Sequence, residues 1–444
     1  MKLHHAQLAG TPDLLALHAA HSLRYPFLLQ SVAGHPTSGR YDLLFGFPEW
    51  ESAETVADGP DFFARLSATV AAVKAPDLPR GLKLPFIGGW FVFLAYEAAA
   101  LVEHSLTLPS IPFALPRAIA VRCPAAVLID RERGSTHVIS QRGSAQLAEL
   151  VADCSAAVEG QAAPNGPLVG KLEEDDPAHY LAGCAKVLEY LKAGDTFQIN
   201  LSRAWRAELN AGVDAAALYR RLCAANPAPF AGLAKFAGAT VLSSSPERLI
   251  SIEGRSVQTR PIAGTRPRGA TAEEDAALQA QLAESLKERA EHVMLIDLER
   301  NDLGRVCEPG SVEVSELMRL ETYTHVHHIV SNVRGTLRAE VGVGEAIAAV
   351  FPGGTITGCP KVRAMQIIAE LEGVGRGAYT GAMGYICCDG KADLNILIRS
   401  LVVEHGQVTL RAGAGIVADS VPEQELAETR SKAKGLLQAL GVEA

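Results

Sequence analysis

The order in which strand and helix signals follow one another constrains the fold of this chain most strongly. Short apolar runs of strand type come in blocks, and helical segments do not alternate with them one by one. A doubly wound parallel sheet needs a helix between successive strands, so this order argues against it. We therefore expect an α+β fold, in which groups of strands form the core and helices cover them.

Two regions are expected along the chain. Residues 1–165 hold short strand-like runs broken by Gly and Pro, and residues 172–440 carry sharper helix and strand patterns. The segment 160–167 (GQAAPNGP) between them is rich in turn-forming residues. A length of 444 residues allows two or three domains, or one large composite domain.

Residues 196–205 alternate between apolar and polar side chains, which is the period of a strand. The polar face could line a site, and a solvated strand face explains the same pattern equally well. Farther along, 271–300 has a continuous helical pattern and 393–403 has a strand pattern. The polar face of the first segment consists of Gln198, Asn200 and Ser202.

Two helical segments each carry a pair of glutamates three residues apart. Glu288 and Glu291 form one pair, and Glu425 and Glu428 form the other. Residues three apart share a helix face, so each pair can direct both carboxylates at one place. Four carboxylates in one pocket repel each other unless a cation lies among them, and Mg²⁺ prefers hard oxygen ligands. With the motifs around them, the pairs predict a magnesium-dependent enzyme that acts on a small anionic substrate.

Composition excludes several classes of protein. The formal net charge of −9 argues against a broad nucleic-acid-binding surface. The longest apolar run, 86–96, is too short to span a bilayer, and the first residues lack the apolar core of a signal peptide. The eight cysteines show no CxxC spacing and are expected to be reduced thiols. We therefore expect a cytoplasmic protein with no membrane and no nucleic-acid partner.

A series of ordered motifs between about 172 and 440 resembles the chorismate-binding enzyme family. The motifs include TRPIAGTRPRG, EHVMLIDLERNDLGRV, FPGGTITGCPKVRAMQIIAELE, RGAYTGAMGYI, ADLNILIRS, RAGAGIV and SVPEQELAETRSKA. So many motifs in one order make the resemblance specific, and LLQS and GRYDLLFGF extend it more weakly towards the N-terminus. The resemblance implies a sandwich-like core of two packed β-sheets surrounded by helices.

The resemblance also implies chorismate as substrate and Mg²⁺ as cofactor. Glutamates matching Glu291 and Glu428 hold the metal, with Glu288 and Glu425 beside them. The metal takes the ring carboxylate of chorismate, which neutralises that charge and orients the ring.

Further roles follow from the same resemblance. Glu247 matches the general acid that protonates the departing 4-hydroxyl, a poor leaving group, and His328 matches a histidine near that hydroxyl. Arg399 resembles an arginine that binds a carboxylate through its two-pronged guanidinium. The positions implied to contact the substrate are Gly264, Thr265, Tyr385, Arg399, Gly413, Ala414, Gly415 and Lys432.

Gln198 is expected to select the nucleophile. Family members that add water carry a lysine base at this position, and neutral glutamine cannot deprotonate water. Ammonia needs no such base because it already has a lone pair. We therefore assign Gln198 a catalytic role in ammonia addition and expect a separate glutamine amidotransferase subunit to supply the ammonia.

Two ammonia-using reactions remain open. FPGGTITGCPK, NPAPF and ADLNI resemble aminodeoxychorismate synthase component I, which makes 4-amino-4-deoxychorismate for p-aminobenzoate and folate. The alternative is anthranilate synthase component I, which aminates carbon 2 and expels pyruvate. Ala263 favours this alternative, because many enzymes of the first type carry a lysine there. We expect the first reaction; a catalytically silent homologue is a distant third possibility, which the presence of the glutamates and the acid opposes.

The string LLQS bears on regulation. Anthranilate synthases usually carry LLES here, as part of a pocket for tryptophan feedback. Gln30 replaces the acid of that string. We therefore expect no strong inhibition by tryptophan.

Overall fold

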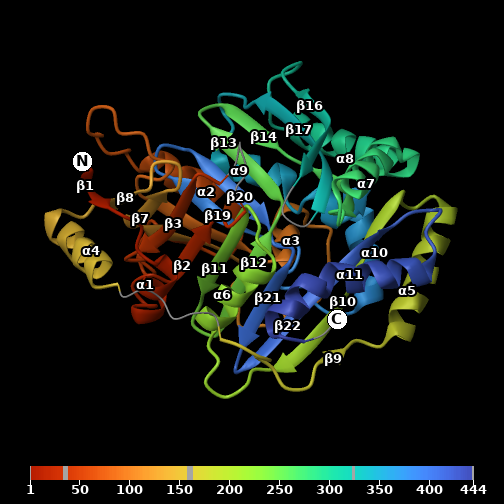
Figure 1. The fold of residues 1–444 in the computed structure, drawn as a ribbon. Helices are drawn as coiled ribbons and strands as arrows, with labels where there is room; N and C mark the ends of the chain where they lie inside the picture. The colour runs from red at the N-terminus through yellow and green to blue at the C-terminus, as the bar shows by residue number, and fades with distance from the viewer. Residues whose placement is uncertain (1, 34–38, 158–163, 323–325, 443–444) are drawn as a thin grey trace.

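The structure is a computed structural model that describes residues 2–33, 39–157, 164–322 and 326–442. Two large antiparallel sheets form its centre, and the helices lie mainly around the outside (Figure 1). The expected α+β fold with two packed sheets is confirmed. None of the helices in the described ranges has the length and apolarity needed to cross a bilayer. All eight cysteines are unpaired thiols, as their spacing predicts.

The first sheet has twelve strands. Across the sheet the order is β1 (His4–Ala9), β8 (Ser135–Ser140), β7 (Ala125–Asp130), β3 (Tyr41–Gly46), β2 (Phe27–Gln30), β11 (Phe230–Lys235), β12 (Ala239–Ser245), β21 (Ser400–Glu404), β22 (Gln407–Ile416), β10 (Gln198–Glu208) and β18 (Gly358–Cys359), and β9 (Glu173–Glu174) pairs with β10.

The second sheet has ten strands. Their order is β15 (Ile262–Pro267), β17 (Val326–Thr336), β14 (Ser256–Thr259), β13 (Arg248–Glu253), β20 (Ala392–Ile396), β19 (Ala382–Cys387), β5 (Gly89–Leu94), β6 (Ala118–Cys123) and β4 (Val56–Ala57), and β16 (Glu313–Thr322) pairs with β17.

The helices cover both sheets and their ends (Figure 1). They are α1 (Leu14–Ala20), α2 (Phe62–Ala72), α3 (Ala99–Val102), α4 (Ser144–Ala156), α5 (Pro177–Ala193), α6 (Ala215–Ala225), α7 (Ala272–Glu284), α8 (Leu286–Gly304), α9 (Val343–Val350), α10 (Lys361–Glu372) and α11 (Pro422–Leu440), with short 3₁₀ turns η1 (Tyr96–Ala98) and η2 (Gly354–Ile356).

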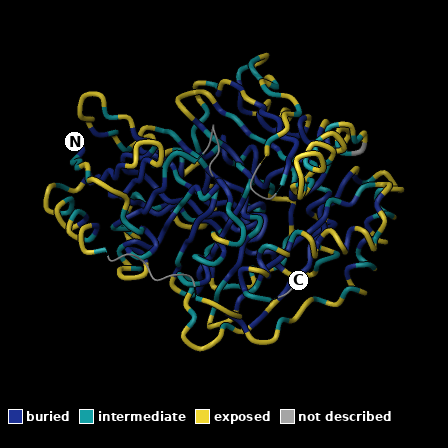
Figure 2. Tube along the Cα trace, viewed as in Figure 1, coloured by how far each residue is buried: buried dark blue, intermediate teal, exposed yellow. Residues whose placement is uncertain are grey.

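Aromatic side chains join the two sheets in the core. Phe27 on β2 stacks on Phe91 on β5 with 4.0 Å between ring centroids, and Phe45 on β3 packs on the same ring. All three are fully buried, and each contributes about 1.5–3 kcal/mol through burial of its apolar surface. Buried residues fill the centre of the molecule, and exposed ones lie on the outer helices and loops (Figure 2).

Both sheets contain strands from the two expected sequence regions. In the twelve-stranded sheet β2 pairs with β11, and in the ten-stranded sheet β5 pairs with β19. Hydrogen-bonded strands therefore connect 1–165 with 172–440. The first half of the expected linker 160–167, residues 160–163, lies outside the described residues.

The segment 271–300, which has a strong helical pattern, forms two helices. α7 ends at Glu284 and α8 begins at Leu286. Ser285 between them has extended backbone angles, and its hydroxyl accepts a hydrogen bond from the Glu288 amide at 3.3 Å. A serine N-cap satisfies an amide that would otherwise lack a partner, so it starts a new helix here.

The segment 393–403 is likewise divided. β20 belongs to the ten-stranded sheet and β21 to the twelve-stranded sheet, so the chain crosses between sheets in a few residues. Arg399 lies in this crossover with a φ of 53°, a left-handed conformation that is uncommon for a side-chain-bearing residue. The apolar pattern continues through the crossover, which is why the sequence predicts one strand.

Candidate active site

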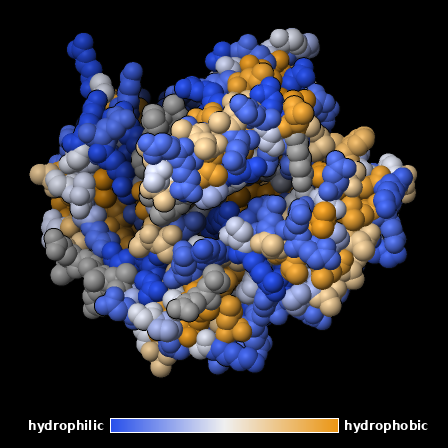
Figure 3. Space-filling model, turned by 45° about the vertical axis from the view of Figure 1, so that its right-hand side comes forward, coloured by the Kyte–Doolittle hydropathy of each residue, from blue (hydrophilic) through white to orange (hydrophobic). Residues whose placement is uncertain are grey.

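A cavity of about 480 Å³ lies where the two sheets approach each other at one end. β10 and β22 of the twelve-stranded sheet line one part of it, and β15 and β17 of the ten-stranded sheet line another. α8 and α11 contribute the remaining long elements. This volume suits a small organic ligand. The face in Figure 3 is hollowed near its centre, with both hydrophilic and hydrophobic residues around the hollow.

Both glutamate pairs line this cavity, as their three-residue spacing predicts. One pair comes from α8 and the other from α11, helices that lie far apart in the sequence. The structure thus brings together all members of the predicted set: Glu288, Glu291, Glu425 and Glu428.

The surroundings of Glu291 favour its protonated form. Burial raises its pKa, and the negative charges of Glu288 and Glu428 raise it further. Gln198 Nε2 donates a hydrogen bond to Glu291 Oε1 at 2.9 Å. Gln198, the predicted selector of the nucleophile, therefore lies directly beside a predicted metal ligand.

Two other glutamates are paired with cations. Lys432 Nζ lies 2.7 Å from Glu428 Oε1, one helical turn away on α11. Arg266 Nη1 donates to Glu288 Oε1 at 3.2 Å. These ion pairs offset part of the repulsion among the carboxylates.

The chemistry of this donor set fits Mg²⁺, because carboxylate oxygens from two helices face one cavity. Among the residues that the structure describes, no three His, Cys, Asp or Glu side chains converge closely enough to form a metal site. The ion pairs of Glu288 and Glu428 and the hydrogen bond of Glu291 account for part of this separation. Coordination of a metal would require these side chains to exchange partners.

Glu247 lies in the turn between β12 and β13 and faces the cavity from a buried position. Thr355 Oγ1, in η2, donates to Glu247 Oε1 at 2.9 Å. Burial raises the pKa of Glu247 to about 7. A carboxyl group with such a pKa can hold a proton at neutral pH and release it to a reacting group.

His328 on β17 also lines the cavity. Its Nδ1 is 2.9 Å from Thr265 Oγ1 on β15, and Gly264 also lines this wall. Burial lowers the pKa of His328 to about 4, and the positive charge of Arg399 lowers it further in the same direction. The imidazole is therefore neutral at pH 7, and it can orient a hydroxyl without carrying charge.

Two cationic side chains lie near these residues in the cavity wall. Arg399, from the crossover between the sheets, donates Nη1 to the backbone carbonyl of Lys432. Both residues line the cavity. Their positive charges suit an anionic substrate group.

Glycines on β22 allow other side chains to approach the backbone. A Cβ on Gly415 would lie 2.3 Å from Gln198 Nε2. A Cβ on Gly413 would lie 2.6 Å from Asn200 Oδ1 and 2.9 Å from the Tyr379 hydroxyl. Any larger residue at either position would displace a side chain of the cavity wall.

Ala414, a predicted substrate contact, is placed differently from the two glycines beside it. Gly413 and Gly415 line the cavity, but Ala414 between them does not. Successive side chains of a strand point to opposite faces, so the alanine side chain is buried on the other side of β22.

Tyr385, another predicted substrate contact, does not line this cavity. Tyr385, in the interior of β19, packs against Phe45 and Phe86 and lines a second cavity of about 230 Å³. Tyr379, six residues earlier in the same motif, lines the first cavity instead. Tyr379 precedes β19, and only this end of the motif reaches the cavity.

Arg411 is a cavity residue that the sequence did not lead us to predict, although the strand pattern around it indicates its position. Arg411 lines the cavity from β22. It is two residues from Gly413 and four from Gly415, so the period of a strand places all three on one face. The same alternation could have identified it.

Several known proteins are similar to this chain over most of its length. The family described as chorismate binding enzyme matches residues 39–438. An anthranilate synthase component I-like protein of Synechocystis sp. is 39% identical over 408 residues, covering 91% of this chain and 84% of the relative. Anthranilate synthase component 1 of Cereibacter sphaeroides is 36% identical over 465 residues, covering 97% of this chain and 92% of the relative.

Solved structures show the same fold. Anthranilate synthase component I from Streptococcus pneumoniae superposes with a TM-score of 0.76 at 28% identity, covering 97% of this chain and 92% of that one. The menaquinone-specific isochorismate synthase MenF of Escherichia coli superposes with a TM-score of 0.76 at 17% identity, covering 99% of this chain and 94% of that one. The latter similarity supports the fold alone.

Proposed function

The chain belongs to the chorismate-binding enzyme family, and on that basis we propose that it converts chorismate and ammonia to anthranilate, pyruvate and water. The observation that carries the proposal is the presence of Gln198 and Ala263 in the cavity wall. Among the described residues that line the cavity, Lys432 is the only lysine. Neither the lysine expected for water addition nor the lysine expected for a covalent adduct at carbon 2 is present.

The motifs favoured amination at carbon 4 and left amination at carbon 2 as the alternative. The present proposal prefers amination at carbon 2. Several similar relatives are named anthranilate synthase component 1, including the proteins of Cereibacter sphaeroides and Pseudomonas aeruginosa. Ala263 supports the same choice, because its small side chain leaves space for ammonia at carbon 2.

The residues act together in the following way. Arg399 and Lys432 bind and orient the carboxylates of chorismate. Glu247 gives its proton to the 4-hydroxyl group, which leaves as water, while His328 orients that hydroxyl. The nitrogen of ammonia forms a bond to carbon 2 beside Gln198, and later loss of pyruvate leaves the aromatic ring.

Mg²⁺ belongs to the proposal as well. Glu291 and Glu428, with Glu288 and Glu425 beside them, would hold the ion, and the bound ion would neutralise the ring carboxylate of chorismate. The donor chemistry supports this assignment, and the three-residue spacing on α8 and α11 supports it further.

Ammonia is proposed to come from a glutamine amidotransferase subunit. Several relatives are named as component 1 of an enzyme, which implies at least one further component in those proteins. Glutamine hydrolysis in a partner would supply ammonia directly to the cavity. Free ammonia at high pH is expected to replace this partner.

Amination at carbon 4, which gives 4-amino-4-deoxychorismate, is the second candidate. The second cavity favours it, because Gln30 lines that cavity where anthranilate synthases usually carry a glutamate. Phe230, from the NPAPF string, lines the same cavity.

The test is ammonium-dependent consumption of chorismate by the purified protein in the presence of Mg²⁺. The proposal predicts fluorescent anthranilate and no isochorismate. Consumption of chorismate at the same rate without ammonium would contradict it. Omission of Mg²⁺ provides the matched control.

A further inference from the structure

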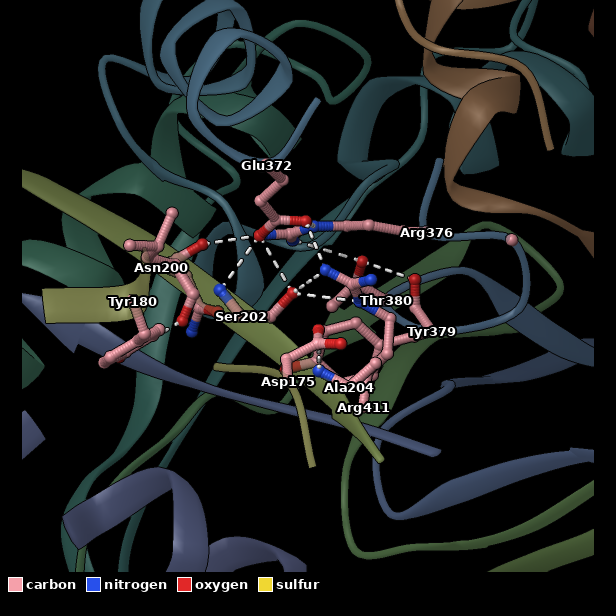
Figure 4. A network of polar contacts seen from close by, with 12 residues as sticks. Asp175, Tyr180, Asn200, Ser202, Ala204, Glu372, Arg376, Tyr379, Thr380 and Arg411 are labelled. Atoms are coloured by element: carbon pink, nitrogen blue, oxygen red, sulfur yellow. Dashed lines mark hydrogen bonds and ion pairs between the residues drawn. The ribbon is translucent and has the colours of Figure 1, made fainter. Parts of the chain in front are cut away.

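A buried carboxylate lies directly behind the cavity wall. Glu372 is the last residue of α10, and its side chain is only 2% exposed. Two arginines bind it from different elements (Figure 4). Arg376 donates Nη2 to Glu372 Oε1 at 2.6 Å and Nε to Oε2 at 3.1 Å, and Arg411 donates Nη2 to Oε2 at 2.8 Å.

Ser202 completes this arrangement from β10. Its backbone amide and its hydroxyl donate to Glu372 Oε1 at 2.9 and 2.8 Å. The same hydroxyl oxygen accepts from Arg411 Nε at 3.2 Å and from Nη2 at 2.9 Å. Arg411 is therefore held on two sides, by Glu372 and by Ser202.

The network reaches the cavity through Arg376 as well. Arg376 Nη2 donates to the backbone carbonyl of Asn200 at 2.6 Å, and its guanidinium lies 5.7 Å from the centroid of the Tyr379 ring. Asn200, Tyr379 and Arg411 all line the cavity. Glu372 itself does not, so any effect that it has on the substrate must act through its neighbours.

Several charged groups meet in and around this network. Burial opposes ionisation of Glu372, yet Arg376 and Arg411 hold its pKa below the usual value, so it carries one negative charge. Two further carboxyl groups lie close by. The Arg376 backbone amide donates to Glu97 Oε1 at 2.7 Å. Burial opposes ionisation of Asp175 as well, but Arg206 and Arg411 lower its pKa.

Arg411 is the charged member of the network that lines the cavity and can contact a ligand. The residue is 7% exposed and lines the cavity. Its Nη1 donates to no partner within the described ranges, whereas Nε and Nη2 are both used. A largely buried guanidinium attracts a carboxylate more strongly than one on the surface, because less water screens the two charges.

We propose that Arg411 binds a carboxylate of the substrate and that Glu372 is the positioning residue that holds Arg411 for this contact. The inference rests on the proposed function, since chorismate supplies the carboxylate. It gives the cavity a second anion-binding arginine besides Arg399. Arg376 likewise connects Glu372 with the cavity wall, because it contacts the Tyr379 ring and the Asn200 carbonyl on β10.

The experiment measures chorismate binding and turnover in charge-matched variants. Dissociation constants are obtained by titration calorimetry with Mg²⁺ and without ammonium, and KM and kcat are measured with ammonium. Arg411→Gln is expected to weaken binding about tenfold to a hundredfold, with a smaller effect on kcat. Arg411→Lys keeps the charge and is expected to recover part of the affinity.

Glu372→Gln keeps the shape and removes the charge that holds Arg411. It is expected to raise the dissociation constant as Arg411→Gln does. If Glu372 acts through Arg411, the double variant binds chorismate no more weakly than Arg411→Gln alone. Arg122→Gln, which alters a buried arginine paired with Glu54 far along the second sheet, is the control for general loss of stability.

Several results would overturn the inference. One is unchanged chorismate affinity in Arg411→Gln, a variant that leaves the Glu372–Arg376 pair intact and therefore remains decisive if Glu372→Gln does not fold. Another is fully additive losses in the double variant, which would show that Glu372 acts independently of Arg411. Failure of the wild-type protein to bind or consume chorismate would instead reject the proposed function, and the inference with it.

Discussion

Burial decides the chemistry of single residues in the cavity. Burial raises the pKa of Glu247 to about 7 and lowers that of His328 to about 4. At neutral pH the carboxyl group is therefore the proton donor, and the imidazole is a neutral hydrogen-bonding group. Motif resemblance predicted both residues from the sequence. Their opposite shifts could not be predicted, because they depend on how closely separate strands pack around each side chain.

The proton on Glu247 predicts a pH dependence. Glu247 is protonated below its pKa and ionised above it, so kcat/KM for chorismate is expected to fall as pH rises through about 7. The concentration of free ammonia must be held constant, because deprotonation of ammonium would otherwise raise the rate. Initial rates across pH 6–9 check the prediction.

Substitution of Glu247 tests its role as the proton donor in a second way. Glu247→Gln is expected to lower kcat roughly 10²- to 10⁴-fold, because glutamine cannot donate an acidic proton. Chorismate affinity is expected to change little. Equal turnover by the wild-type protein and this variant would remove the proposed acid role.

At the scale of elements, strand and helix periods predicted much of the site. The alternation on β10 predicted Gln198 and Asn200 on one face, and the three-residue spacing predicted the shared face of each glutamate pair. Local sequence patterns could not show where a strand ends or where the chain passes from one sheet to the other. Arg399 reaches the cavity because β20 and β21 join different sheets, and this crossover interrupts no apolar pattern.

The same limit explains the tyrosine that was misplaced. Tyr379 and Tyr385 lie in one motif, and both have the chemistry of a substrate contact. Which of them faces the cavity depends on where β19 begins, at Ala382. That boundary is set by pairing with β5 and β20, which are distant in the sequence.

The pairs on α8 and α11 predict dependence on a divalent cation. Removal of metal with a chelator is expected to abolish chorismate consumption, and Mg²⁺ is expected to restore it. Glu291→Gln is expected to raise the Mg²⁺ concentration needed for half-maximal activity at least about tenfold. Full activity of chelated, metal-free protein would contradict the assignment of these carboxylates.

At the scale of the whole molecule, strands of both packed sheets line two of the cavities found among the described residues. The first combines β10 and β22 with β15 and β17, and the second lies among β2, β3, β11, β19 and β20. Each cavity contains strands from both sheets. An N-terminal strand therefore contributes to the second cavity although the catalytic motifs lie later in the sequence.

The second cavity predicts weak binding of tryptophan. An amino-acid ligand needs a carboxylate for its ammonium group, and Gln30 is neutral. Asp393 lines this cavity, but Arg248 binds it with distances of 2.8 and 3.0 Å. Titration calorimetry is expected to show no micromolar binding by the wild-type protein and tighter binding after Gln30→Glu. Micromolar binding by the wild-type protein would contradict this account of the cavity.

The site of amination is the central claim, and ¹⁵N-ammonium tests it most directly. The purified protein is incubated with chorismate, Mg²⁺ and ¹⁵N-ammonium, and the products are identified by mass spectrometry. We predict ¹⁵N-anthranilate with one pyruvate released for each molecule formed. Appearance of ¹⁵N in 4-amino-4-deoxychorismate, with pyruvate released only after a separate lyase is added, would contradict amination at carbon 2.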